Sequence, residues 1–340
     1  MKTNFVKIHQ KLFDSLPGKF KKHFFLVERK EWANQTAISL EGIDKFLNET
    51  EFPWDTIILT IEIWHYPDIE KIIAEHPRLQ DKNVFVVTVG YKNYKFGNKC
   101  WLLSFPWGNT EQFKIYKSSN NGFREHGLQY GFSSLNGRPA VHRILLGYFL
   151  HQQNLLDNLI FTQNIHGPID AEIFNTLPKF DDYKKLLPIS TVEHKDSLKW
   201  DMFGEFNHPA YNQAYCNIVT ETETEIVPYQ QNQNIEMITE KSGKPFFTKQ
   251  IPLFLAGQGH LSYLKYLGFE TMDDLTPTGY DQMRTLEKIA AIVDIVARGR
   301  DYIEDFYFNH LREIQHNYEL ATSGTLEGKI VADIQQLING

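Results

Sequence analysis

The chain has 340 residues, 42% of them hydrophobic and 14% aromatic, with a formal net charge of −7 at pH 7. Such a chain can bury a sizeable core, and its length favours two domains. The acidic balance argues against sequence-independent binding of nucleic acid, although a local basic groove stays open. No run reaches the roughly 18 apolar residues of a membrane helix, and the first residues contain no apolar signal core. We therefore expect a cytoplasmic protein without a membrane span.

The first 130 residues predict a parallel sheet. Four apolar runs read as buried strands, at 24–28, 56–63, 83–90 and 100–105, and DIEKIIAEH has helical spacing between the second and the third. Strands that alternate with helices are typical of doubly wound α/β domains. Cys100, and Cys216 later in the chain, lie in such apolar runs, which favours buried reduced thiols over a disulfide or a metal site.

A stretch rich in Gly, Asn and Ser, residues 118–139, has a turn-forming composition and predicts a crossing between domains. A second alternation follows it. We expect a helix in 141–158 and strands at 159–162, 214–221 and 251–256, then further helices from Thr239, at 260–269 and from about residue 280. These features predict three segments: an acceptor domain at 1–125, a donor-binding domain at 126–278 and a helical segment at 279–340.

The segment 238–274 carries the most chemistry. Thr239 can cap a helix that begins with Glu240, and Lys241 adds an ammonium group near a helix N-terminus, where free N–H groups attract anions such as a diphosphate. The strand before Gly257 and Gln258 ends in a glycine turn and another helix, which is where open α/β sheets bind ligands. Taken singly, each feature is also typical of ordinary capping or of a plain turn.

The order of four motifs resembles glycosyltransferases of the two-Rossmann (GT-B) architecture, in particular the exostosin-like and fucosyltransferase-like groups and their viral and bacterial relatives. The motifs are VTET, ITEKSGKP, IPLFLAG and LSYLKYLGF, at 219–222, 238–245, 251–257 and 261–269. The resemblance implies an α/β fold with two Rossmann-like domains facing a cleft and C-terminal helices. It also implies a nucleotide-sugar donor, UDP- or GDP-linked, which is a substrate rather than a cofactor.

The resemblance implies roles for individual residues. Glu240 matches the acid that grips the donor ribose, Lys241 its basic neighbour at the phosphates, and Glu221 an acid near the nucleotide or sugar. Lys244 lies one helical turn further on and is a second candidate for the phosphates. The chain departs from the fucosyltransferase pattern at the threonines beside Glu221 and at SGKP, so fucose is not predicted as the transferred sugar.

A basic segment, LNGRPAVHR at 135–143, begins the first helix of the proposed donor domain and resembles one in the viral and bacterial relatives. Arg138 and Arg143 could present planar guanidinium groups to a diphosphate whose charge grows as the sugar leaves. The alternative is that both arginines lie on the surface and that His142 is a packed or solvated imidazole.

No Asp-x-Asp motif occurs in the sequence, and this pair holds the ion in metal-dependent transferases. We therefore expect no metal. Glu221, Glu223 and Glu225 alternate along a strand, which is more often a solvated edge than a metal site.

The catalytic base is the least determined part of the site. Glu62 and His65 follow the second strand, where such a base could lie, but a structural strand end is the simpler interpretation. Tyr94, Trp101 and Trp107 could stack on a sugar, although dense aromatic residues are usually core.

The sequence thus predicts an enzyme that transfers a sugar from a nucleotide-sugar to the hydroxyl of a carbohydrate or another small acceptor. Two alternatives stay open. One is a transferase that modifies hydroxymethylated bases in phage-type DNA, which the acidic balance disfavours. The other is a protein that binds nucleotides on the same scaffold without catalysis, which the lack of an obvious base favours.

Overall fold

The structure is a computed structural model of the full chain. It describes the following residues: 24–26, 48, 56–60, 66–88, 94–104, 122–137, 140–163, 172–191, 211–221, 240–323, 325–326, 328–329, 332–333 and 336. By its contacts the chain divides into two compact units. The first comprises residues 1–111, 229–237 and 324–340, and the second comprises residues 112–228 and 238–323.

The first unit contains a five-stranded sheet of order β1-β2-β3-β5-β4. Its strands are β1 (Phe24–Leu26), β2 (Thr56–Thr60), β3 (Asn83–Thr88), β4 (Tyr94–Lys95) and β5 (Cys100–Ser104). The four longer strands are parallel, and β4 pairs antiparallel with β5. The four apolar runs of the sequence are therefore strands, as predicted. Helix α3 (Tyr66–Glu75) lies between β2 and β3 in the sequence, as its spacing predicted.

The core of the first sheet is built around β3, where Val84, Phe85 and Val86 are all buried. Trp101, from the neighbouring strand β5, stacks on Phe85 with the ring centroids 4.9 Å apart. The ammonium group of Lys95 lies 5.7 Å from the centre of the Trp101 ring. Trp101 is thus packed between protein groups, which supports the core interpretation for this residue.

The second unit contains a five-stranded sheet of order β10-β9-β6-β7-β8. Its strands are β6 (Tyr130–Asn136), β7 (Leu159–Gln163), β8 (Ile189–Ser190), β9 (Ala214–Thr220) and β10 (Ile251–Leu255). All pairs are parallel except β7 with β8. Numbered within this sheet, the order is 3-2-1-4-5, which reverses direction between β6 and β9. The structure is therefore an α/β protein with sheets that are mainly parallel.

Strand β6 corrects the prediction that residues 118–139 are a turn-rich crossing. It is the central strand of the second sheet, although it contains Gly131, Ser133 and Ser134. A Cβ atom on Gly131 would lie only 2.9 Å from Ile303 Cγ2, because helix α10 (Gly299–Asn309) packs against this strand. The two serine hydroxyls donate hydrogen bonds to carbonyls of β9. Small residues therefore mark close packing here, not a turn.

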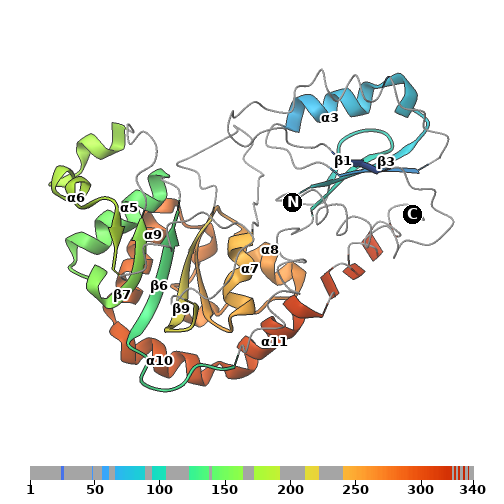
Figure 1. Ribbon diagram of the computed structural model, residues 1–340. Coiled ribbons are helices and arrows are strands. Elements are labelled where there is room, and N and C mark those ends of the chain that lie inside the picture. The colour runs from blue at the N-terminus through green and yellow to red at the C-terminus, as the bar shows by residue number, and fades with distance from the viewer. Residues whose placement is uncertain are drawn as a thin grey trace. The chain divides into compact units, whose positions relative to one another are not determined.

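Seven α-helices of the described chain belong to the second unit. They lie around its sheet (Figure 1). They are α5 (Val141–Gln152), α6 (Phe180–Leu186), α7 (Glu240–Phe247), α8 (His260–Leu267), α9 (Thr285–Ala297), α10 and α11 (Leu311–Thr322). Helices α5, α7 and α8 begin close to the positions that the sequence predicted. Helices α9 to α11 pack within this same unit, α9 against α5 and β10 and α11 against α7. The predicted segment limits at residues 125 and 278 remain predictions.

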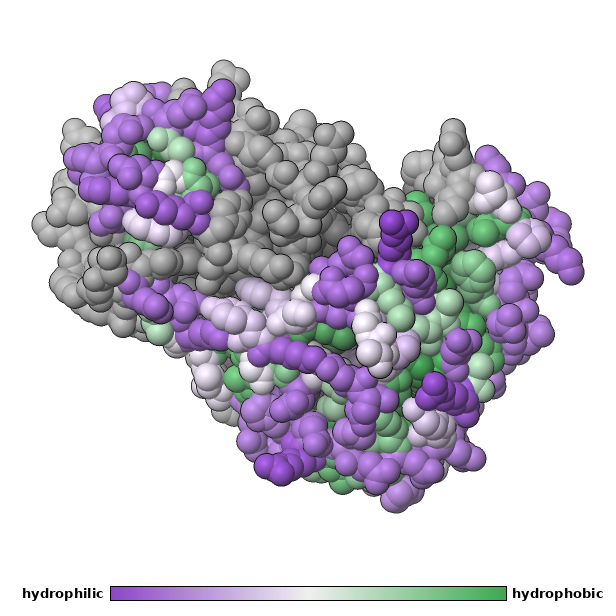
Figure 2. Space-filling view, turned by 180° about the vertical axis from the view of Figure 1, so that it is seen from behind, coloured by the Kyte–Doolittle hydropathy of each residue, from purple (hydrophilic) through white to green (hydrophobic). Residues whose placement is uncertain are grey.

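The core of the second unit is apolar and fills both faces of its sheet. Every residue of β7, β9 and β10 is buried. Cys216 of β9 and Cys100 of the first unit are buried free thiols, as predicted, and burial raises the pKa of both. Figure 2 shows one face of the molecule, on which the apolar residues of the second unit are seen between hydrophilic residues that cover much of its edge.

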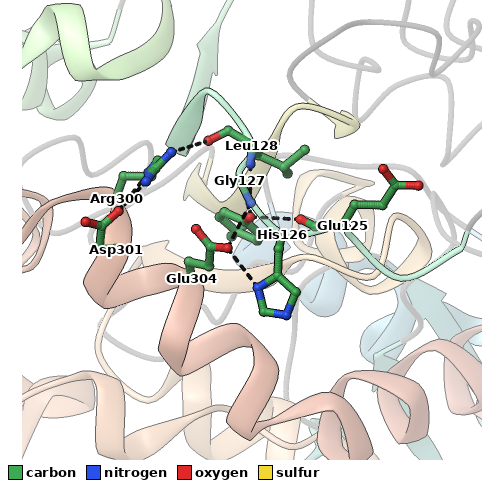
Figure 3. Close-up of polar contacts among 8 residues, drawn as sticks. Glu125, His126, Gly127, Leu128, Arg300, Asp301 and Glu304 are labelled. Carbon is green, nitrogen blue, oxygen red and sulfur yellow. Dashed lines mark hydrogen bonds and ion pairs between the residues drawn. The ribbon is translucent and has the colours of Figure 1, made fainter.

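Residues 125–128, just before β6, are fastened to α10 at the amino end of the sheet (Figure 3). The carboxylate of Glu304 accepts from Gly127 N at 2.9 Å and lies 3.0 Å from His126 Nδ1. Arg300 Nη1 donates to the carbonyl of Leu128 at 3.4 Å. These contacts explain why α10 belongs to the second unit, since they fix the entry to its central strand.

A buried arginine, Arg124, makes further hydrogen bonds near the start of β6. The guanidinium of Arg124 donates to the carbonyls of Tyr211 and Thr248, and its main-chain N–H donates to the hydroxyl of Tyr307 at 2.9 Å. Burial lowers the pKa of Arg124. Three segments that are distant in the sequence are thereby joined next to the start of β9. In the described parts of the chain, no helix is long and apolar enough to cross a membrane.

Candidate functional site

The carboxyl ends of β6 and β9 define the candidate site. The strand order reverses between these neighbours, and open α/β sheets bind ligands outside the carboxyl ends of their strands at such a reversal. At this edge Asn136 ends β6 and accepts the hydroxyl of Thr220, the last residue of β9, at 2.6 Å. The two strand ends are therefore joined by buried polar side chains.

Helix α5 begins beside this edge with an uncapped N-terminus. Its N-cap residue is Ala140, which has no side-chain oxygen, and its first turn contains no acidic residue. The first N–H groups of a helix carry partial positive charge and attract anions. His142 and Arg143 lie in this first turn, and both are buried. The start of α5 therefore combines a helix dipole with a guanidinium group.

Glu221, directly after β9, joins α5 to the sheet through its main chain. Its N–H donates to the carbonyl of Leu255 on β10 at 3.0 Å. Its carbonyl accepts from His142 Nε2 at 2.9 Å and from Arg143 Nη2 at 3.0 Å. Arg143 Nη2 also donates to the carbonyl of Thr220 at 3.2 Å. Arg143 is thus held in place by the end of β9.

The side chain of Glu221 joins the sheet to α7 and α8. Ser242, on α7, donates its hydroxyl to Glu221 Oε1 at 2.5 Å. His260 Nε2, at the first residue of α8, lies 3.1 Å from the same hydroxyl oxygen. Because the one hydroxyl proton of Ser242 goes to the carboxylate, we assign the bonding proton of the second contact to His260 Nε2.

This Glu–Ser–His group differs from the arrangement of a nucleophilic serine. A serine nucleophile passes its proton to a histidine, and the acid bonds the far side of that histidine. Here the carboxylate bonds the serine itself, and Ser242 and Glu221 are both fully buried. The group is therefore suited to holding the end of β9, α7 and α8 in place relative to one another. The expectation that Glu221 belongs to a solvated edge is wrong, because its side chain is enclosed by α7 and α8.

Lys241 shares this region with Arg143, and the pKa of His142 reports the proximity. That pKa is lowered to about 3, first by burial and then by the positive charges of Arg143 and Lys241. His142 is therefore a packed and neutral imidazole, one of the two alternatives in the sequence. Because His142 Nε2 donates its proton in the hydrogen bond to the Glu221 carbonyl, Nδ1 of the same ring is an acceptor. This atom is buried and has no hydrogen-bond partner in the described residues. The charges of Arg143, at the start of α5, and of Lys241, at the start of α7, thus both act on this neutral ring.

The N-terminus of α8 is occupied by a protein carboxylate. Asp281 accepts from the N–H groups of Leu261 at 2.8 Å and Ser262 at 3.1 Å, and from the hydroxyl of Ser262 at 2.6 Å. Gly259 N donates to the Asp281 carbonyl at 3.2 Å, and its φ of 85° explains the glycine. The helix N-terminus that follows Gly257 and Gln258 is therefore already neutralised, unlike that of α5.

The glycine turn at the end of β10 is held by protein groups. Lys288, a buried residue of α9, donates to the carbonyls of Ala256 at 3.0 Å and Gly257 at 2.9 Å. The amide of Gln258 donates to the carbonyl of Gln282 at 2.5 Å. Both residues predicted to bind the donor here thus make structural contacts. Their role toward a donor stays a prediction.

The other predicted residues divide by whether the structure describes them. Arg143, Glu221 and Lys241 come together at the carboxyl edge. Lys244 is half-buried on α7. Glu240 begins α7, but its side chain is not among those described. Seven further residues that were singled out lie outside the described residues: Glu62, His65, Trp107, Arg138, Thr239, Glu223 and Glu225.

Three residues of the site were missed in the sequence. Ser242 lies in SGKP, which read only as a departure from a family pattern, and His260 read only as the first residue of a helix. Lys288 lies in an apolar helix where nothing distinguishes it from a surface lysine. The useful signal for Lys288 is its position among apolar residues of α9, since a lysine on the buried face of a helix must be bonded.

Comparisons with models of protein families, with curated proteins and with solved structures found no match to this chain.

Proposed function

We propose that the chain is a glycosyltransferase that moves a sugar from a nucleotide-sugar to an acceptor hydroxyl, with the donor bound by the second unit. The observation that carries the proposal is the position of Arg143 and Lys241 in the first turns of α5 and α7, next to the reversal of strand order, where the positive charges of both lower the pKa of His142. A diphosphate needs cations and N–H groups, and this edge offers both.

The proposal includes a Rossmann-like donor domain in the GT-B sense. The order 3-2-1-4-5 of the second sheet supports it, since this order belongs to dinucleotide-binding sheets. The first sheet follows the chain through β1, β2, β3 and β5 without a reversal among its described strands. A Rossmann-like acceptor domain there rests on the sequence resemblance alone.

In the proposed reaction, the bond between the anomeric carbon and the diphosphate oxygen breaks while the acceptor oxygen bonds to that carbon. Negative charge grows on the leaving diphosphate, and fixed cations stabilise it more in the transition state than in the bound donor. Arg143 is held in place by two carbonyls and needs little reorganisation. The acceptor proton requires a base, for which Glu62 and His65 remain candidates.

The test is a thermal-shift panel with UDP, GDP, CMP and their sugars, followed by an assay for release of the nucleotide. Ligand that binds only the folded protein at about 100 times its Kd stabilises it by about 2.7 kcal/mol. We expect one diphosphate to raise the Tm and its sugar conjugate to be hydrolysed slowly without acceptor. Binding without any turnover would favour the inactive nucleotide-binding alternative, and no Tm change with any nucleotide would contradict the proposal.

Two additions to the assay separate the remaining alternatives. Excess EDTA should leave turnover unchanged, whereas loss of turnover that manganese or magnesium restores would overturn the metal-free expectation. An oligonucleotide with a hydroxymethylated base should not accept the sugar better than simple saccharides do. Preferential labelling of the oligonucleotide would favour the DNA-modifying alternative.

A further inference from the structure

The contacts of Glu221 suggest a role that differs from the one its resemblance implies. This residue is fully buried, and its carboxylate is bonded to Ser242 inside the protein. Instead, four elements meet at it. Its main chain bonds β10 and α5, its carboxylate bonds α7 through Ser242, and Ser242 in turn bonds His260 of α8.

The two cations of the site depend on these same bonds for their positions. Arg143 donates directly to the Glu221 carbonyl. Lys241 is the neighbour of Ser242 on α7, so the bond from Ser242 to Glu221 fixes the helical turn that carries Lys241. A hydrogen bond between two buried side chains is a positional constraint, because breaking it leaves buried polar groups without a partner. The relative placement of Arg143 and Lys241 is therefore set at Glu221.

We propose that Glu221 and Ser242, supported by His260, are positioning residues that hold α5 and α7 so that Arg143 and Lys241 address the same diphosphate. This inference rests on the proposed function and refines it, because it removes Glu221 from direct contact with the donor. The neutral state of His260 agrees with it. Its pKa is lowered to about 4, chiefly by burial, so the ring places no additional positive charge beside the two cations.

The test is a double-mutant cycle read by titration calorimetry with UDP, GDP and inorganic pyrophosphate at pH 7.5. If Ser242 acts by positioning Lys241, Ser242→Ala should weaken binding about tenfold, a loss that does not exceed the one expected from removing Lys241 itself. The same substitution should change the affinity by less than about twofold in a Lys241→Ala background, since the group that it positions is gone. Ser242→Thr keeps the hydroxyl and should restore most of the affinity.

Ser262→Ala is the matched control. Ser262 also lies in the first turn of a helix and also donates to a carboxylate, that of Asp281 at 2.6 Å, but α8 carries neither cation. Its removal should lower the Tm without changing the affinity. Independent losses from Ser242→Ala and Lys241→Ala, or a Ser242→Ala variant that changes only the Tm, would overturn the inference while leaving the proposed function standing. A wild-type protein that binds none of the three probes would overturn both.

Discussion

At the scale of single residues, Lys241 is more exposed than Arg143, the other cation at the carboxyl edge. It is half-buried, whereas Arg143 is buried. We predict that Lys241→Ala weakens binding of the nucleotide diphosphate by about 1.5 to 3 kcal/mol, the range for a hydrogen bond to a charged group. Calorimetric titration measures this. Lys265→Ala is the control, because Lys265, on the surface of α8, forms an ion pair with Asp273. A lower Tm with unchanged affinity would make Lys241 structural.

Arg143 is expected to act mainly on the leaving group. We predict that Arg143→Ala lowers kcat by roughly a hundredfold or more and that Arg143→Lys loses less, since lysine keeps the charge without the planar fork. The structure adds a second effect. The Arg143 guanidinium donates to the carbonyls of Thr220 and Glu221, so Arg143→Ala should also lower the Tm. Measuring kcat, affinity and Tm for both variants separates the effects, and wild-type turnover in Arg143→Ala would remove Arg143 from the site.

At the scale of elements, the packing of α5 on its neighbours depends on Gly147. A Cβ atom there would lie 2.1 Å from the hydroxyl of Tyr183 and 2.5 Å from Gln163 Oε1, two groups that share a hydrogen bond of 2.8 Å. We predict that Gly147→Ala lowers the free energy of unfolding by about 1 to 3 kcal/mol, the usual cost of overpacking. Urea denaturation measures it.

Gly257→Ala is the matched control for this packing. A Cβ atom at Gly257 has no neighbour within 4 Å, so the free energy of unfolding should hardly change. The same variant tests the predicted role of Gly257, because close approach of the donor to that backbone would make Gly257→Ala weaken nucleotide binding. A Gly147→Ala variant as stable as the wild type would show that α5 shifts to accept the methyl group.

At the scale of the whole molecule, two buried histidines predict a loss of stability in mild acid. The pKa of His142 is lowered to about 3 and that of His260 to about 4, both chiefly by burial. In the unfolded chain a histidine titrates near about 6.5, so the unfolded state binds more protons as the pH falls below that value. The stabilisation from burying the neutral rings is complete above this pH. At pH 5 it should have fallen by about 2 kcal/mol for each histidine.

Urea denaturation between pH 8 and pH 5 measures this loss of unfolding free energy. The relevant unfolding transition is that of the second unit, which is the transition that Gly147→Ala should also shift. The glutamine of the variant His260→Gln cannot gain a proton. The difference in free energy of unfolding between this variant and the wild type should therefore become smaller as the pH falls. Asn217→Ala removes a buried polar side chain that does not titrate. The difference in free energy of unfolding between Asn217→Ala and the wild type should therefore stay constant with pH. Parallel curves for the wild type and His260→Gln would contradict the prediction.

The sequence by itself determined most of the elements. Strands β3, β7, β9 and β10 are apolar runs bounded by polar residues, and α8 ends at Gly268, whose φ of 100° requires glycine. These signals are local, because each depends on periodicity or on one backbone conformation. For the same reason the sequence placed Arg143, Glu221 and Lys241 near strand ends and helix starts.

Only the tertiary structure decided which of these signals form one site and which strand lies at its centre. Strand β6 was missed because its small residues are selected by α10 and β9, which are distant in the sequence. Glu221 reads as a solvated acid until Ser242 and His260 enclose it, and the N-terminus of α8 reads as an anion site until Asp281 fills it. Burial and hydrogen-bond partners depend on groups far apart in the chain, so the sequence alone could not assign them.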